Sequence, residues 1–267
     1  MALPRLHLFE FNDSSWAPRP LRDTIVEALS RTLSWGRLLG GLVAPFEEFV
    51  ERAGVDEVLD VCAGAGGPAR ILVDEIRRAG RKPPRFLLTD LQPQLEAWQA
   101  AQRAFPDEIG FVAAPIDATA IPRDVAGGRA RVIINSFHHF PPELAQSILR
   151  DAVEGSAGIF IAEPWERNPL RFGTFIPVGV LALAVNPFLS GRDRLVKGLL
   201  TFASPAVTAV ALWDGLVSTM RVYSRQELEA MVAPLGDRFT WTFGYHRYSP
   251  GGRGYYFYGI PRRQSAA

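Results

Sequence analysis

The sequence predicts an α/β fold, in which a doubly wound and mostly parallel sheet is completed by an antiparallel strand pair. Two observations predict it. Between Val55 and Glu163, short apolar runs of strand length alternate with segments of helical spacing, which is the pattern of parallel strands joined by crossover helices. Towards the end of the sequence, two strand-like runs are separated only by a turn, and such a short connection joins antiparallel strands.

The composition provides a sizeable core for one large domain or two small ones, because 48% of the 267 residues are hydrophobic. The 29 Lys and Arg balance the 28 Asp and Glu, and no basic run stands out, so no nucleic-acid partner is expected. The single cysteine, Cys62, excludes a disulfide framework and a multi-cysteine metal site, and no metal is expected. The first residues lack a charged segment leading into an apolar run, so we expect a cytoplasmic protein without a signal peptide.

Residues 1–53 are expected to form an N-terminal helical cap. Leu21, Ile25 and Leu29 recur at helical spacing, and glycines then interrupt the pattern before a second short helix expected from Pro45 to Arg52.

The central segment 54–163 is expected to supply most of the sheet. Five strands are predicted in it: Val55–Val61, Arg85–Thr89, Phe111–Ala113, Arg131–Ser136 and Ile159–Glu163. Helices are predicted from Pro68 to Ala79, from Pro93 to Ala104 and onward from Pro142, since proline is favoured at a first helical position.

Residues 164–222 form an apolar insertion, in which Phe172–Leu189 and Leu199–Trp213 carry no charge and basic residues lie between them. We expect a helical lid over an active site. Packing in the core, a dimer face, contact with a bilayer surface and a two-pass membrane hairpin are the alternatives, and prolines in both runs disfavour the last.

Residues 223–260 are expected to complete the core. Ser224 and Glu227 have the spacing of a capping box and predict a helix through Val232. The closing strand pair is predicted at Arg238–Phe243 and Arg253–Ile260, and residues 261–267 are expected to be a tail.

The most informative motif runs from Asp60 to Pro68, with the sequence Asp-Val-Cys-Ala-Gly-Ala-Gly-Gly-Pro. A strand ends there, glycines turn the chain, and a helix begins, so backbone N–H groups can approach a ligand closely. The run also fits the loose dinucleotide pattern G-x-G-x-x-A. However, the carboxylate of Asp60 would repel a pyrophosphate and would attract a cation. S-adenosylmethionine carries a sulfonium and an ammonium group and no phosphate, so the charge argument favours it.

This loop resembles that of the class I S-adenosylmethionine-dependent methyltransferases, in which an acid is followed by three alternating glycines. Here the pattern reads Asp60, Cys62, Gly64 and Gly66, with Cys62 in place of the first glycine. The resemblance covers about residues 55–163 and implies a seven-stranded Rossmann-like fold, with which the closing strand pair agrees. It also implies that S-adenosylmethionine is the cofactor.

The resemblance further implies which residues contact that cofactor. Asp90 matches the acid that holds the ribose hydroxyls, and Asp117 matches the group near the adenine amine. The remaining expected contacts are Ala63, Leu91, Ala118, Asn135 and Ser136. From the residues alone, Asp90 could instead be a helix N-cap, and Asp117 could be an ordinary loop carboxylate.

Catalytic candidates follow the fourth strand, because ligands of open α/β sheets bind beyond the carboxyl ends of the strands. His138 and His139 would lie by the methyl group, where a neutral histidine can accept the proton of a hydroxyl acceptor. Packing or a backbone hydrogen bond is the alternative for either one. Glu163, after the fifth strand, would orient a substrate or cap the next loop. Substrate contacts are expected from Trp16, Phe137, His139, Glu163, Phe172 and Trp213.

The resulting hypothesis is a methyltransferase that acts on a lipophilic small molecule, with an oxygen acceptor preferred. The alternatives are a nicotinamide-dependent reductase and a membrane-surface protein that binds S-adenosylmethionine without transferring its methyl group. Peripheral membrane contact and homo-oligomerisation both remain open.

Overall fold

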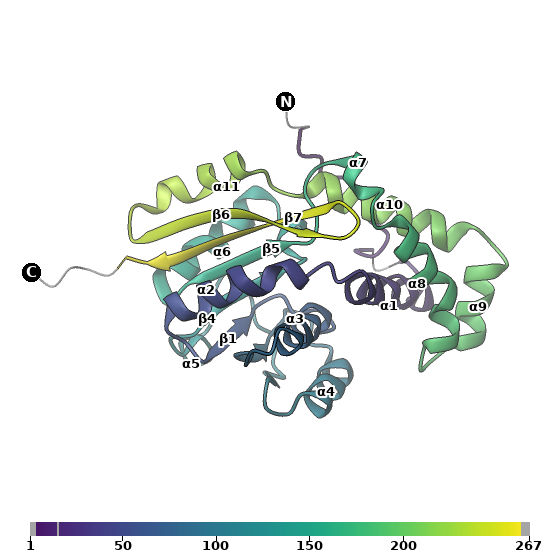
Figure 1. The fold of residues 1–267 in the computed structure, drawn as a ribbon, viewed down its shortest axis with the longest axis horizontal. Coiled ribbons are helices and arrows are strands. Elements are labelled where there is room, and N and C mark those ends of the chain that lie inside the picture. The colour runs from purple at the N-terminus through teal and green to yellow at the C-terminus, as the bar shows by residue number, and fades with distance from the viewer. Residues whose placement is uncertain (1–3, 15, 263–267) are drawn as a thin grey trace, which may run out of the picture. The chain divides into compact units, whose positions relative to one another are not determined.

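The computed structural model of the protein describes residues 4–14 and 16–262, and its helices and strands are labelled in Figure 1. The last five residues of the expected tail, 263–267, lie outside the described residues. The helices are α1 (Arg19–Trp35), α2 (Val43–Ala53), α3 (Gly67–Arg78), α4 (Leu95–Ala104), α5 (Arg123–Ala126), α6 (Pro142–Gly155), α7 (Pro169–Phe172), α8 (Ile176–Leu189), α9 (Arg194–Phe202), α10 (Ala206–Arg221) and α11 (Arg225–Val232). Three short 3₁₀ helices are η1 (Gly40–Leu42), η2 (Phe137–His139) and η3 (Ala233–Leu235).

Seven strands form one sheet in the order β3-β2-β1-β4-β5-β7-β6. They are β1 (Glu57–Asp60), β2 (Arg85–Leu88), β3 (Ile109–Phe111), β4 (Ala130–Ile134), β5 (Ile159–Glu163), β6 (Phe239–Tyr248) and β7 (Gly252–Pro261). The strands β1 to β5 pair in parallel, and β7 pairs antiparallel with β5. The predicted fold class is therefore confirmed.

Helices cover both faces of this sheet. Val132 of β4 is in register with Phe160 of β5, whose ring contacts α2 through Phe46, with ring centroids 5.2 Å apart. The preceding residue, Arg131, points to the other face, because successive side chains of a strand alternate. There its guanidinium pairs with Asp151 of α6. The sheet is doubly wound, as the sequence predicts.

The core around α2 is aromatic. Phe46 and Phe49 are fully buried and contact Phe86 of β2, Phe160 of β5 and Tyr258 of β7 at centroid separations of 5.2 to 5.7 Å. Such ring pairs stabilise beyond the apolar area that they bury, by about 0.5–1.5 kcal/mol each. This cluster holds α2 against three strands that lie far apart in the sequence.

Most predicted elements are found within two residues of their expected ends, and α11 begins with the predicted capping box of Ser224 and Glu227. The third strand is shifted. It spans Ile109–Phe111, where the sequence predicts Phe111–Ala113. The reason is that the apolar run continues past the last residue that pairs with β2, which is Phe111 opposite Leu88.

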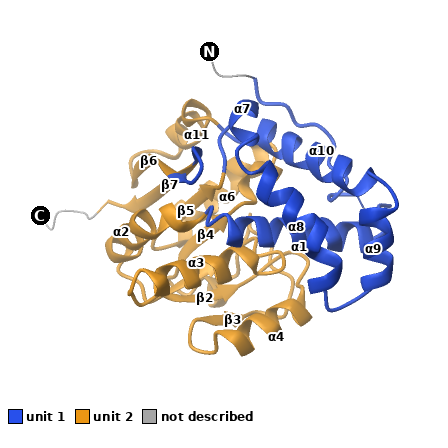
Figure 2. Ribbon diagram, turned by 45° about the vertical axis from the view of Figure 1, so that its right-hand side comes forward, with its two compact units in different colours: residues 1–38, 165–223, 247–253 blue, residues 39–164, 224–246, 254–267 orange. Residues whose placement is uncertain are grey.

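The chain forms two compact units, which Figure 2 colours separately. Unit 1 comprises residues 1–38, 165–223 and 247–253, and unit 2 comprises residues 39–164, 224–246 and 254–267. Unit 2 contains most of the sheet. Unit 1 is largely helical, and its apolar centre is formed by Ala28 of α1, Ala182 and Leu183 of α8, and Val207 of α10.

The first residues of unit 1 follow α10 closely. Asp214 accepts hydrogen bonds from the backbone N–H groups of Phe11 (2.8 Å) and Asn12 (3.0 Å). Arg221 pairs with Asp13 at 2.8 Å and with Glu10 at 3.0 Å. The carboxylate of Asp214 thus satisfies two backbone donors, which explains an acidic residue within an otherwise apolar helix.

Among the described residues, no single helix has both the length and the apolar character needed to cross a membrane. The helices α9 and α10 have that length and apolar character only when they are counted as one segment, and the chain bends by 83° between the two.

Candidate functional site

The glycine loop joins β1 to α3 and turns through two left-handed residues. Gly64 has φ +52° and Gly66 has φ +76°, a region that side chains with a Cβ atom disfavour. A Cβ atom at Gly66 would lie 3.0 Å from Cδ1 of Leu88, whereas one at Gly64 would meet no described atom within 4 Å. The loop is therefore tightly packed at Gly66 and open at Gly64. The helix α3 begins at Gly67 with Pro68 in its first turn, as predicted.

Asp90, after β2, holds the open part of this loop. Its Oδ2 accepts a hydrogen bond from Gly64 N at 2.8 Å, and its Oδ1 accepts one from Gln92 N at 2.9 Å. The alternative that Asp90 is a helix N-cap is wrong, because α4 begins at Leu95 and its N-cap is Gln94. Asp90 instead lies in a bend that brings its carboxylate to the glycine loop.

Trp98 supports the same loop and was not expected from the sequence. Its indole Nε1 donates to the carbonyl oxygen of Gly64 at 2.8 Å, and its side chain is fully buried. The two residues are 34 positions apart. In the sequence, Trp98 looks like any large residue on the buried face of a helix, so no local signal could have found this role.

Asp117 lies on the segment next to Asp90, since Ile116 N donates to the backbone carbonyl of Asp90 at 2.9 Å. Oδ1 of Asp117 accepts from Thr119 N (2.8 Å) and from the Thr119 hydroxyl (2.7 Å). These bonds lower the pKa of Asp117, so the carboxylate stays charged. Of the predicted neighbours, Ala118 is buried and Leu91 is exposed.

Asp60, at the end of β1, is almost completely buried. The pKa of Asp60 is raised to about 7: burial is the main cause, a hydrogen bond from the backbone of Cys62 opposes it, and the nearby charge of Asp90 adds to it. Burial and the three acids Asp60, Asp90 and Asp117 also raise the pKa of the Cys62 thiol, which therefore stays protonated. Ala63 N donates to the carbonyl of Thr89 at 3.1 Å, which ties the loop to β2.

Asn135 follows β4 at the same edge of the sheet. It has φ +61°, which is rare for a residue other than glycine, although asparagine tolerates it better than most. Its N–H donates to the carbonyl of Ala162 at 2.9 Å. Its side-chain Oδ1 is buried and has no hydrogen-bond partner among the described residues. A strained backbone beside a buried acceptor is typical of a ligand site. The neighbouring Ser136 hydroxyl lies 3.5 Å from the carbonyl of Cys62.

His138 and Glu163 form a buried pair at the ends of the adjacent strands β4 and β5. Glu163 Oε1 accepts from the backbone N–H of His138 at 3.0 Å, and Oε2 lies 2.9 Å from Nδ1 of the ring. His139 is only half-buried, and its ring centroid lies 4.2 Å from that of His138. Phe137, the first residue of η2, is fully buried. The Glu163 carboxylate therefore orients the His138 ring.

His246 of β6 completes this cluster and was missed in the sequence. Its Nε2 donates to the backbone carbonyl of Glu163 at 3.0 Å, across 83 positions of the chain. Burial lowers the pKa of His246 to about 4, against the raising effect of that hydrogen bond. The ring is therefore neutral near pH 7, and it fixes the end of β5 from the side of the closing strand pair.

Three predicted substrate contacts belong to unit 1. Trp16 is 66% exposed and stacks on Phe9 with ring planes 3° apart, and Trp213 donates from Nε1 to the carbonyl of Phe9 at 2.9 Å. Phe172 is buried, with its ring edge-on to Phe175 at 4.8 Å. Within unit 1, Phe172 therefore packs in the interior, and the two tryptophans remain accessible.

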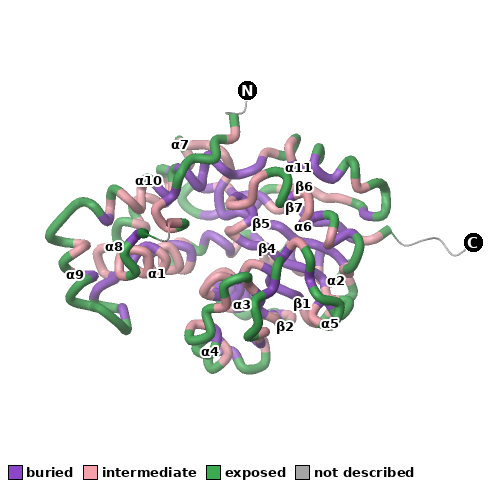
Figure 3. The backbone as a smooth tube through the Cα atoms, turned by 180° about the vertical axis from the view of Figure 1, so that it is seen from behind, coloured by how far each residue is buried: buried purple, intermediate pink, exposed green. Residues whose placement is uncertain are grey.

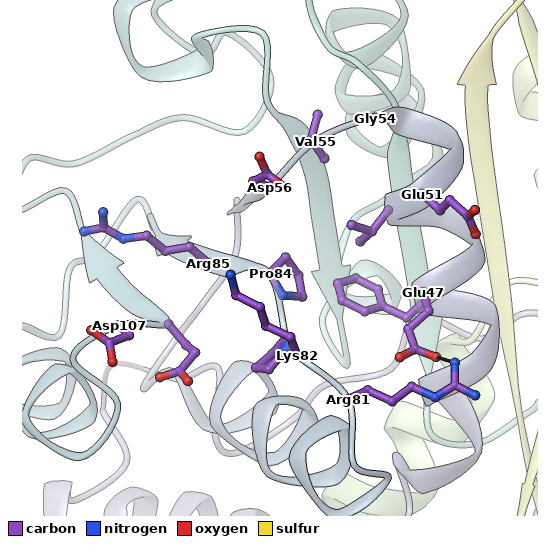
Figure 4. Close-up of a pocket in the computed structure, with 14 residues that line it drawn as sticks. Glu47, Glu51, Gly54, Val55, Asp56, Arg81, Lys82, Pro84, Arg85 and Asp107 are labelled. Carbon is purple, nitrogen blue, oxygen red and sulfur yellow. Dashed lines mark hydrogen bonds and ion pairs between the residues drawn. The ribbon is translucent and has the colours of Figure 1, made fainter.

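Unit 2 also has a pocket of about 720 Å³ at the opposite edge of the sheet. It is lined by residues that precede or begin the strands, among them Asp56, Lys82 and Arg85. Figure 4 shows Glu47 and Arg81 turned toward each other across a 2.6 Å ion pair. Ligands of open α/β sheets bind at the carboxyl ends of strands. This pocket lies at the amino ends, away from the glycine loop and the His138–Glu163 pair.

No protein-family model matches the sequence, and no curated protein matches it either. Solved structures do match. The plantazolicin methyltransferase BpumL, in complex with SAH, superimposes with a TM-score of 0.56 at 11% identity over 94% of each chain. A protein of Nostoc punctiforme assigned as an O-methyltransferase superimposes with a TM-score of 0.51 at 14% identity, over 96% of this chain and 64% of its own chain. TnmH superimposes with a TM-score of 0.50 at 19% identity, over 91% of this chain and 59% of its own chain.

At these identities the comparison shows the fold, and the fold is the one that the glycine loop implies. The chain has the Rossmann-like fold of the class I methyltransferases. It spans less than two thirds of the Nostoc protein and of TnmH.

Proposed function

We propose that this chain is an S-adenosylmethionine-dependent methyltransferase that acts on the hydroxyl group of a lipophilic small molecule. The observation that carries the proposal is the convergence of Asp60, Asp90 and Asn135 around the glycine loop of a methyltransferase fold. Each residue comes from the carboxyl end of a different strand. Together they offer two carboxylates and a buried carbonyl oxygen, a set of acceptors suited to a cationic and hydroxyl-rich ligand.

The electrostatics of the loop support a cation over a diphosphate. Burial makes the charged form of Asp60 unfavourable, and a bound ammonium or sulfonium group would restore it. The buried Oδ1 of Asn135 can accept a hydrogen bond from an ammonium group and would repel a phosphate oxygen. A nicotinamide cofactor would place its pyrophosphate beside these acceptors, so the reductase alternative is disfavoured.

The remaining acids fit the rest of the cofactor. Each carboxylate oxygen of Asp90 accepts one hydrogen bond from the protein. Because a carboxylate has about four lone-pair sites, Asp90 can still accept hydrogen bonds from ribose hydroxyls. Both hydrogen bonds of Asp117 fall on Oδ1, which leaves Oδ2 to accept from an adenine amine. When bound, S-adenosylmethionine supplies an electrophilic methyl group.

The pair of His138 and Glu163 supports an oxygen acceptor. Because the Glu163 carboxylate accepts the hydrogen on Nδ1, the lone pair of His138 is directed from Nε2. That nitrogen can take the proton of a hydroxyl as the oxygen attacks the methyl carbon and the carbon–sulfur bond breaks. His138 would hold that proton after transfer, and bound S-adenosylmethionine would supply the methyl group and keep the electron pair of the broken bond on its sulfur. A nitrogen or carbon acceptor that arrives unprotonated has no need of such a base.

A direct test is calorimetric titration of the protein with S-adenosylmethionine and with NADH. We expect saturable binding of S-adenosylmethionine alone, and at least a tenfold weaker affinity in Asp90→Ala. Asp107→Ala is the matched control, because that acid is exposed at the opposite edge of the sheet. Transfer of labelled methyl from S-adenosylmethionine to a panel of phenols, carboxylates and amines then identifies the acceptor. Binding of NADH in its place would overturn the proposal, and binding without transfer to any acceptor would remove the enzymatic part.

A further inference from the structure

Most residues of the helix α9 of unit 1 are exposed or half-buried (Figure 3), and most of the exposed ones are apolar. Leu195, Leu199 and Phe202 are 86%, 67% and 60% exposed, and their spacing of four and three residues places them on one side of the helix. Phe188, at the end of α8, is 69% exposed, and its ring lies 6.1 Å from that of Phe202. Scattered exposed leucines are ordinary, but a contiguous set of this kind marks a surface that binds something apolar.

The opposite side of α9 carries the charge. Lys197 is 1% exposed, and its ammonium lies 2.8 Å from Glu27 of α1 and 2.5 Å from the buried hydroxyl of Ser190. A surface helix of a globular protein normally turns its apolar side toward the core and its lysines toward solvent. Leu200 of α9 does pack against the apolar centre of unit 1. The ion pair of the buried Lys197 with the partly exposed Glu27 lies on that inner side, and Leu195, Leu199 and Phe202 are left on the outer side. A buried charge of this type is costly unless it is paired, so the orientation is held by specific partners and is not the result of a loose surface helix.

The charge around this face is positive. Arg192 is exposed in the turn between α8 and α9, Arg194 is exposed at the first residue of α9, and Asp193 is the only acid between residues 176 and 213. The same sign extends over the whole unit. Unit 1 contains thirteen Lys and Arg against seven Asp and Glu, whereas unit 2 contains sixteen against twenty-one. The net charge of +1 is therefore the sum of a basic helical unit and an acidic unit that contains most of the sheet.

We propose that the outer face of α9, with Phe188, Arg192 and Arg194, binds the surface of a lipid bilayer that contains anionic lipids. An apolar helical face beside basic side chains is the feature that inserts into the boundary between headgroups and acyl chains. The helix is too short to span, which fits a contact that lies in the plane of the surface. A second copy of the chain is a less suitable occupant, because its own α9 face would bring the same arginines against these. The inference is independent of the proposed catalytic function.

Co-sedimentation of the full chain with vesicles tests this inference. The two vesicle types are phosphatidylcholine alone and an equal mixture of phosphatidylcholine and phosphatidylglycerol. We expect binding to the anionic vesicles that weakens as salt is raised, and at least tenfold weaker binding to the neutral ones. The double variant L195E/L199E should lose binding to both. Leu144→Glu, at an exposed leucine of unit 2, is the control and should bind like the unaltered protein.

A second pair of variants separates the charge from the apolar face. R192E/R194E should lose the preference for anionic vesicles, whereas Arg238→Glu, on the acidic unit, should keep it. Circular dichroism of each variant verifies the fold. Absence of sedimentation with either vesicle type would overturn the inference. So would sedimentation velocity that shows a stable dimer which L195E/L199E dissociates, because a second copy would then cover this face.

Discussion

His138 and Glu163 are joined twice, once through the backbone and once through the ring. Oε1 of Glu163 accepts from the histidine N–H at 3.0 Å, and Oε2 lies 2.9 Å from Nδ1. A single carboxylate therefore fixes both the position of the histidine backbone and the orientation and tautomer of its imidazole. His246, which donates to the carbonyl of Glu163, holds that carboxylate's own backbone in place.

Removing either partner of this pair should slow transfer to a hydroxyl acceptor. For His138→Ala we expect kcat to fall by about 10²–10⁴-fold, the usual contribution of a general base. In Glu163→Gln we also expect a lower kcat. The glutamine amide can donate to Nδ1 of His138, which would move the ring hydrogen to Nε2 and leave that nitrogen unable to accept a proton. The measurement is kcat against pH with the acceptor found in the panel. His7→Ala, at an exposed histidine of unit 1, is the control, and an unchanged kcat in His138→Ala would rule out a specific role for the pair.

Cofactor binding should release a proton from Asp60. The pKa of this acid is about 7 in the free protein, and a bound cation lowers it, so affinity should rise with pH up to about 7 and then level off. The slope should approach tenfold for each pH unit below 7. Calorimetry in two buffers of different ionisation enthalpy measures the proton directly. Asp60→Asn should bind with no pH dependence in this range, and a proton count of zero in the unaltered protein would contradict the assignment.

The same pKa predicts how stability of the free protein depends on pH. Between pH 4 and pH 7 the folded state keeps a proton on Asp60 that the unfolded chain has released, so this group stabilises less as the pH rises. His246 acts in the other direction. Its folded pKa of about 4 lies below the ordinary 6.5, so protonation of the unfolded chain destabilises the fold as the pH falls through that window.

The variant His246→Gln should flatten the acid side of the stability curve, since glutamine can still donate to the Glu163 carbonyl and does not titrate. Between pH 6.5 and pH 4 we expect the unaltered protein to lose up to about 3 kcal/mol that the variant keeps. Urea denaturation at several pH values measures the difference. His7→Gln, at an exposed histidine of unit 1, should leave the curve unchanged. Parallel curves for His246→Gln and the unaltered protein would contradict the prediction.

The two left-handed glycines of the loop should respond differently to alanine. Gly66→Ala places a Cβ 3.0 Å from Leu88 and should destabilise by more than the backbone cost of about 1–2 kcal/mol alone. Gly64→Ala should lose stability only through that backbone cost, because its Cβ would lie in open space. We expect it to reduce binding of S-adenosylmethionine at least tenfold while the protein stays folded. Thermal melts and calorimetry on both variants separate the effects, and unchanged binding by Gly64→Ala would place the ligand elsewhere.

Features that depend on neighbouring residues could be predicted from the sequence. The strands, the proline and glycine positions of α3 and the capping box of α11 follow from local preferences. The roles of Asp90 and Asp117 were implied by the resemblance that the glycine loop carries. Trp98 and His246 could not be found in this way, because their partners lie 34 and 83 positions away. The orientation of α9 was equally hidden. Its apolar residues predict burial, but the ion pair of Lys197 with Glu27 lies on the inner side and Leu195, Leu199 and Phe202 are left on the outer side.

The position of β7 has a consequence for how the sheet can be assembled. β7 follows β6 in the chain but lies between β5 and β6, so β6 has no neighbour in the sheet until β7 has been synthesised. The parallel strands can pair as they leave the ribosome, whereas the ten residues of β6 must wait with their backbone groups unpaired. A nonsense codon or a proteolytic cut before β7 would therefore detach two strands at once, along with the histidine that anchors Glu163.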